Sequence, residues 1–97
     1  MICLSRPVKP RNICCQPKAY YFKPRGIPLV ELEEVVLLLD EFEALRLKDV
    51  VGLQQEQAAE QMHISRATFQ RILTSARQKV ADSIIHSKAL RIEKKTD

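Results

Sequence analysis

The chain has 97 residues, of which 45% are hydrophobic, so we expect one compact domain and neither two independent cores nor wholesale disorder. The longest apolar run covers only residues 35–39, which is too short to span a bilayer, and residues 1–10 lack the apolar core of a secretory signal. We therefore expect a cytoplasmic protein with no membrane partner. The net charge of +4 divides into +6 over residues 1–26, −7 over residues 27–60 and +5 over residues 61–97. Such a distribution indicates a surface for a polyanion, although basic ends that are only solvated tails would carry the same charges.

The first 28 residues contain all five prolines of the chain. Proline fixes φ and removes an amide donor, so we predict an extended, basic, proline-rich arm over residues 1–28, with a short strand over residues 19–22. We expect the aromatic side chains of that strand to cover the helical core, with base stacking or a dimer seam as alternatives. These aromatic residues are Tyr20, Tyr21 and Phe22. Three cations of the arm either follow a DNA groove or are merely solvated: Arg6, Lys9 and Arg11.

The cysteines are odd in number, which argues against a disulfide framework and predicts reduced thiols. They are Cys3, Cys14 and Cys15. Structural zinc needs about four spaced ligands, and besides the cysteines the chain offers only His63 and His86, so we expect no bound metal. With two glycines in the whole chain there is no phosphate-binding loop, and no side-chain pair is placed for catalysis. We expect no enzymatic activity, no cofactor and no small-molecule substrate.

The remaining residues, 29–97, are predicted to form a mainly α-helical domain of three helices. Residues 29–39 are ambiguous, because their glutamates suit a helix whereas the run of valines and leucines suits a buried strand. Asp40 and Glu43 have the spacing of a capping box, in which each side chain bonds an amide at the start of a helix. The first helix is therefore predicted to begin at Asp40 and to end at Gly52.

Two further helices are predicted after that glycine, one over about residues 54–62 and one that starts after Ser65 and extends to about His86. Six apolar residues of the third helix recur at helical spacing and predict its buried face: Phe69, Ile72, Leu73, Ala76, Val80 and Ile84. The charged residues 88–97 are predicted to be a frayed end.

The segment QEQAAEQMHISRATFQRI, residues 55–72, meets the requirements of a helix-turn-helix in order, and we expect this motif over about residues 54–86. Ala59 is the small residue at the helix crossing, and His63 stands at the turn position that needs a positive φ, at a modest cost relative to glycine. Ile64 is the buried aliphatic residue after the turn, and Ser65 caps the next helix. The alternative is an amphipathic hairpin that only packs.

The exposed face of the predicted third helix is basic and rich in amides, which is typical of a helix that reads base edges in the major groove. The predicted base-reading residues are Arg66, Ala67, Gln70, Arg71 and Thr74. The predicted phosphate contacts are Ser65, Thr68, Arg77 and Lys79. We predict a sequence-specific regulator of transcription that binds double-stranded DNA, as a homodimer because one such unit covers few base pairs. The alternative is a protein–protein adaptor whose acidic residues face a basic partner: Asp40, Glu41, Glu43 and Asp49.

Four segments of the chain also carry a family resemblance: YFKPRGIPL, ELEEVVLLLDEFEALRLKDVVGL, QEQAAEQMHISRATFQRIL and ARQKVADSIIHSKALRIE. Over residues 6–93 the chain resembles an uncharacterised bacterial and archaeal family of short predicted DNA-binding proteins, whose helix-turn-helix is similar to region four of sigma factors. The resemblance implies that the long helix after the turn enters the major groove, and it implies no regulon or ligand. Members of that family often have two N-terminal cysteines separated by three residues. Here Cys14 occupies the second place and Pro10 the first.

Overall fold

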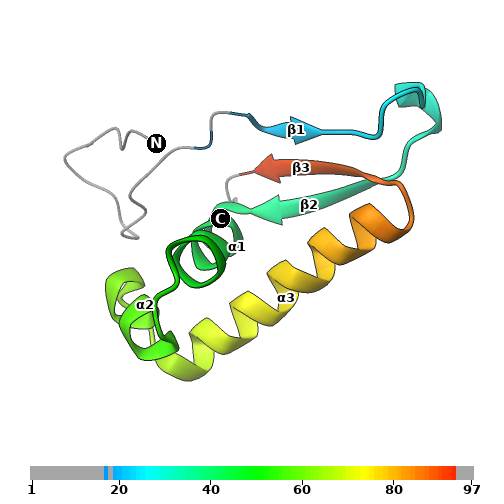
Figure 1. Cartoon of the computed structure of the whole chain (residues 1–97). Helices are drawn as coiled ribbons and strands as arrows, with labels where there is room; N and C mark the ends of the chain where they lie inside the picture. Colours follow the sequence, from blue (N-terminus) through cyan, green and yellow to red (C-terminus); the bar gives the residue numbers. More distant parts are fainter. Residues whose placement is uncertain (1–16, 18, 94–97) are drawn as a thin grey trace.

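Over the residues that the structure describes, the fold consists of three α-helices and a small three-stranded sheet, and the sheet lies along the longest of these helices (Figure 1). The structure is a computed structural model, and it describes Pro17 and residues 19–93. The strands are β1 (Tyr21–Phe22), β2 (Glu34–Leu38) and β3 (Ala89–Glu93). The α-helices are α1 (Leu39–Leu45), α2 (Gln55–Met62) and α3 (Arg66–Ile85). A 3₁₀ turn η1 (Leu29–Glu31) precedes β2, and a π-helical segment η2 (Arg46–Val51) continues α1.

The three strands form one sheet in the order β1-β3-β2, in which β3 is antiparallel to β1 and parallel to β2. All three α-helices lie between β2 and β3 in the chain, so the parallel pair β2–β3 joins segments on either side of the helical region (Figure 1). The prediction of a frayed end over residues 88–97 was wrong for Ala89–Glu93, which is the central strand. The prediction of a mainly helical domain with three helices is confirmed. It gave one strand over residues 19–22 and left residues 29–39 open, and it missed strand β3.

Strand β2 resolves the ambiguity of residues 29–39, since β-branched and aliphatic residues there suit a pleated, half-buried backbone. Its register places Leu37 opposite Ile92 of β3, and both side chains are buried against Ala76 of α3. These residues form the core beneath the sheet. Phe42 and Leu90 are partly buried and pack against the same core.

The start of α1 differs from the predicted capping box. The helix begins at Leu39, and Glu41 accepts a hydrogen bond from the backbone N–H of Leu38 at 2.9 Å. Glu43 is 1% exposed and instead pairs with Arg46, with both N···O distances 2.9 Å. The predicted end at Gly52 is confirmed, because the glycine adopts a left-handed φ of 91° that closes η2.

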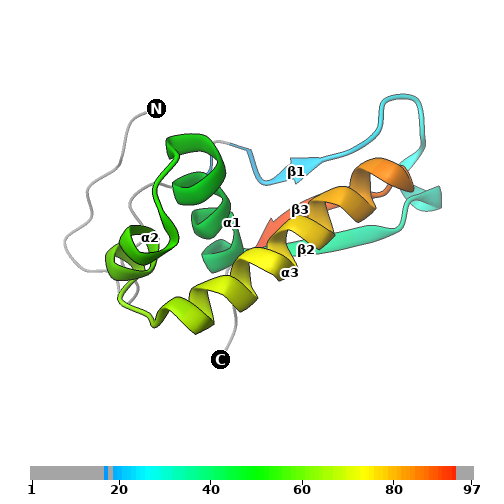
Figure 2. The same ribbon diagram turned by 60° about the horizontal axis from the view of Figure 1, so that its bottom comes forward.

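A second core lies where α1 and α2 meet the first half of α3 (Figure 2). Its buried members are small or apolar residues from α1, η2, α2 and α3: Ala44, Leu47, Ala58, Ala59, Met62, Phe69 and Leu73. Phe69 and Leu73 are both fully buried, so they anchor α3 to the other helices. Ala58 and Ala59 of α2 are 0% and 3% exposed, so this helix packs closely against the core through small side chains.

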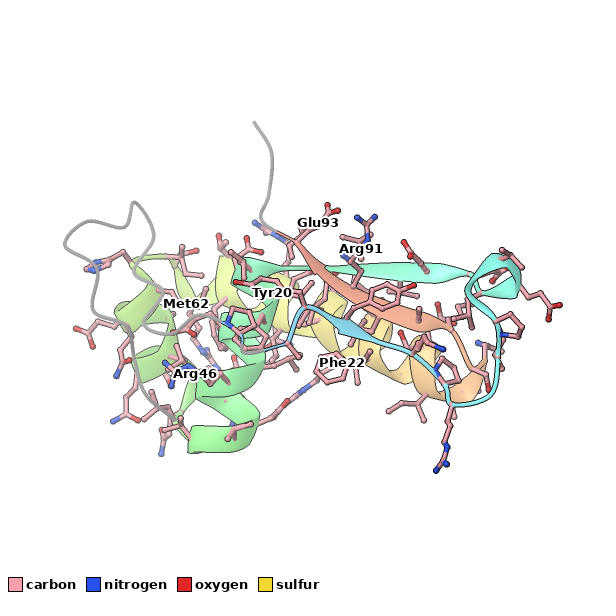
Figure 3. All side chains as sticks on the ribbon, turned by 90° about the horizontal axis from the view of Figure 1, so that it is seen from above. Tyr20, Phe22, Arg46, Met62, Arg91 and Glu93 are labelled. Carbon is pink, nitrogen blue, oxygen red and sulfur yellow. The ribbon has the colours of Figure 1, made fainter. Side chains whose placement is uncertain are left out.

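Two expectations about buried residues were wrong. Ile84 is 71% exposed and Val80 only partly buried, because both line an open groove between β1 and the last turns of α3. Tyr20 and Phe22 are 47% and 53% exposed, so they do not cover the helical core. Figure 3 shows both side chains beside β1, where the strand lies at the edge of the sheet.

Candidate nucleic-acid interface

The turn between α2 and α3 has the backbone that the sequence predicts. His63 adopts φ 59° and ψ 42°, the left-handed region, and its side chain is exposed. The N–H of Ile64 donates to the carbonyl of Ala59 at 3.0 Å, which satisfies a carbonyl at the end of α2. Ala59 is 3% exposed. The turn therefore sets the direction of α3 through backbone bonds and close packing.

The first turn of α3 is fixed by its cap. Ser65 accepts a hydrogen bond from the N–H of Thr68 at 3.1 Å and donates one from its hydroxyl to Thr68 Oγ1 at 2.9 Å. No acidic residue lies in this turn, so the positive end of the helix dipole is not neutralised by its own side chains. Both residues are predicted phosphate contacts, and the structure brings them together at the helix start.

The five predicted base-reading residues are all exposed on α3, with Arg66 at its start: Arg66, Ala67, Gln70, Arg71 and Thr74. Two hydrogen bonds order this face. Gln70 donates to the hydroxyl of Thr74 at 3.2 Å, and Arg71 donates to that of Thr68 at 3.4 Å. Because these partners are hydroxyls at the surface, one exposed and one partly exposed, the amide and the guanidinium can exchange them for base edges at little cost.

The four cations of α3 differ in their carboxylate partners. Arg66 lies 3.6 Å from Glu56 of α2, Arg77 lies 2.6 Å from Asp49 of η2, and Lys79 lies 2.8 Å from Glu41 of α1. Within residues 19–93, Arg71 has no ion-pair partner. Among the four cations of α3, Arg71 is therefore the one whose charge is left available to an external anion.

Lys79 is part of a partly buried network around Glu41, although the sequence predicts it as a phosphate contact. The side chain of Glu41 is 7% exposed and accepts bonds from Lys79 and from the hydroxyl of Ser75, the latter at 2.6 Å. Burial alone would raise the pKa of Glu41, but the bonds from Lys79, Ser75 and the amide of Leu38 outweigh it and lower that pKa. Lys79 thus holds α3 against α1.

Arg77, another predicted phosphate contact, forms a two-pronged pair with Asp49, with N···O distances of 2.6 and 3.0 Å. The hydrogen bonds from Arg77 lower the pKa of Asp49, and those to Asp49 raise the pKa of Arg77. The partners are separated by 28 residues in the chain. No sequence pattern along α3 could have predicted this ion pair, because it depends on the position of η2 beside α3 in the folded chain.

The far end of α3 has a different character. A groove of about 410 Å³ lies between β1 and the last turns of α3, and its apolar lining includes Phe22, Val80 and Ile84. The outer face of the sheet is instead polar: Arg91 pairs with Glu34 at 3.2 Å and also with Glu93, beside which it lies in Figure 3. These features are remote from the turn before α3.

Several predictions fall outside the described residues, namely the arm contacts Arg6, Lys9 and Arg11 and the three cysteines. In the part of the chain that the structure describes, no three His, Cys, Asp or Glu side chains gather to hold a metal ion. None of the helices in that part has the length and apolar character needed to cross a bilayer.

Comparison with known proteins places the chain in a family. The family described as "Protein of unknown function DUF134" matches residues 1–96. The chain belongs to this family. A UPF0251 protein of Caldanaerobacter subterraneus is 54% identical over 90 residues, which cover 93% of this chain and 76% of the relative. A UPF0251 protein of Dehalococcoides mccartyi is 61% identical over 90 residues, or 93% of this chain and 77% of the relative. No solved structure matches the chain.

Proposed function

We propose that this protein binds double-stranded DNA in a sequence-specific manner and regulates transcription. In this proposal α2, the turn at His63 and α3 act as a helix-turn-helix similar to region four of sigma factors, and α3 enters the major groove. The observation that carries the proposal is the exposed face of α3, where Arg71 has no carboxylate partner among the described residues. Phe69 and the Ser65 cap hold that face in a fixed orientation.

The exposed residues of α3 have distinct roles in this proposal. Arg71 forms paired hydrogen bonds to guanine, and Gln70 forms paired bonds to adenine, as guanidinium and amide groups do in the major groove. Arg66, Ala67 and Thr74 complete the base-reading face. At the start of the helix, Ser65 and Thr68 face a phosphate, where free amides and the helix dipole favour an anion.

Selection of bound sequences from a random duplex pool tests this function directly. We expect enrichment of a defined site, and a log–log salt slope of about −4 or steeper if several phosphates are neutralised. Absence of binding to any duplex at low salt would favour the adaptor function instead. The structure gives that alternative little support, because Glu41, Glu43 and Asp49 already pair with cations of the same chain.

Homodimerisation is part of the proposal, since two linked units would read two half-sites and double the contacts. The exposed isoleucines Ile84 and Ile85, 71% and 72% exposed, lie at the end of α3 remote from the reading turn. Arg71 is 13 residues before Ile84, about 20 Å along the helix. Two copies joined near this end would therefore separate their Arg71 side chains by up to about 40 Å, which is compatible with half-sites one DNA turn apart. Light scattering with and without the selected duplex measures the stoichiometry.

A further inference from the structure

The three ion pairs that join α3 to α1, η2 and α2 differ in how deeply they are buried and how close the partners are. At one extreme, Glu41 is 7% exposed, so releasing Lys79 would leave a carboxylate buried without its cation. At the other, Arg66 and Glu56 are 64% and 65% exposed and 3.6 Å apart, a loose pair that water screens. Arg77 lies between these cases: its pair is close and two-pronged, yet the side chains are 49% and 39% exposed.

The position of Arg77 suits a DNA contact. Arg66 and Arg77 are 11 residues apart, which is close to three helical turns, so they project from the same side of α3 about 16 Å apart. The partner carboxylates, Glu56 and Asp49, come from α2 and η2, which flank that side of α3. A helix lying in the major groove has a phosphate strand along each side, so Arg77 is on the flank that such a strand would follow.

We propose that Asp49 is an internal competitor of DNA: it occupies the guanidinium of Arg77 and keeps this cation from a backbone phosphate. This inference rests on the proposed function. A carboxylate and a phosphate both fit the planar fork of a guanidinium, so they compete for the same donors of Arg77. Because the Asp49 side chain is 39% exposed, water can solvate its carboxylate once Arg77 has left it. Arg77 can therefore exchange Asp49 for a phosphate without leaving a buried charge behind. Asp49 thus sets the affinity of the protein for DNA without contacting DNA.

The substitution Asp49→Asn tests this competition, because the amide has nearly the shape of the carboxylate but cannot hold Arg77 as an ion pair. The matched control is Glu60→Gln, which removes one negative charge from an exposed residue of α2 that has no ion-pair partner among the described residues. Binding of both variants and the wild type to a fluorescently labelled duplex of mixed sequence is measured across a salt series. A third variant combines Asp49→Asn with Arg77→Ala and is compared with Arg77→Ala alone.

We expect Asp49→Asn to bind about three- to tenfold more tightly at about 50 mM salt, with a log–log salt slope steeper by about 0.9, which corresponds to one additional phosphate. Glu60→Gln should change both quantities much less. The gain should vanish when Arg77 is also removed. A gain equal to that of Glu60→Gln, or one that persists without Arg77, would overturn the competition while leaving DNA binding intact. If neither the wild type nor any variant binds a duplex, the proposed function fails together with this inference.

Discussion

The buried carboxylate of Glu41 should make the stability of the domain depend on pH in a defined way. Glu41→Gln preserves the size of the side chain and removes the charge that Lys79 faces at 2.8 Å. Breaking a fully buried pair costs about 3–5 kcal/mol, but the Lys79 side chain is 31% exposed and regains some hydration. We therefore expect a loss of about 2–3 kcal/mol at neutral pH, equivalent to a melting temperature lower by roughly 10–20 °C.

The sign of the pH dependence follows from the lowered pKa of Glu41. A carboxyl group whose pKa is lower in the folded state stabilises the fold fully above its unfolded value, about 4.3, and loses this contribution as the pH falls through the folded value. Asp49 also has a lowered pKa, so the wild type loses stability in acid for more than one reason. The difference in unfolding free energy between the wild type and Glu41→Gln, followed against pH, isolates the contribution of the Glu41 carboxyl group.

Urea denaturation of both proteins, followed by circular dichroism between pH 7 and pH 3, measures this difference. It should be largest at pH 7 and should shrink as the pH falls below about 4.3, because a protonated glutamate resembles glutamine. Equal stability of the two proteins at pH 7, or a difference that stays constant into acid, would refute the account of the network around Glu41.

Two further substitutions test the turn and the anchor of α3. His63→Gly should preserve folding or raise stability by about 0.5–1 kcal/mol in thermal melts, because His63 has a φ of 59° that glycine adopts without strain; a large loss would show that its side chain is packed or bonded. Phe69→Ala should lower the free energy of unfolding by about 3–5 kcal/mol, since this fully buried ring would leave a cavity. A loss below about 1 kcal/mol would mean that α3 does not depend on this anchor.

Much of the region from α2 to α3 could be predicted from the sequence because its signals are local. The cap at Ser65, the left-handed turn at His63 and the apolar residues Phe69 and Leu73 all act within a few residues of one another. The start of α1 shows the limit of such signals. Asp40 and Glu43 have the spacing of a capping box, but Glu41 bonds the amide of Leu38 and burial draws Glu43 to Arg46.

The sheet and the ion pairs could not be predicted, because they depend on contacts between distant parts of the chain. Strand β3 pairs with β2, which lies more than fifty residues earlier, and nothing local in Ala89–Glu93 specifies that partner. The same holds for the predicted phosphate contacts Arg77 and Lys79, whose carboxylate partners lie 28 and 38 residues away. Exposure of Arg71, by contrast, follows from its position two residues after Phe69 on one helix.

The most direct test of the central claim compares Arg71→Ala with the wild type in two assays, affinity for the selected duplex and thermal melting. Loss of a paired contact to guanine should weaken specific binding by about 1–3 kcal/mol and relax the preference at one base position. Melting should shift by less than the equivalent of about 0.5 kcal/mol, because Arg71 is exposed and, among the described residues, its side chain bonds the hydroxyl of Thr68 alone. If Arg71→Ala melts early and still binds the site with wild-type affinity, α3 does not read DNA with this face.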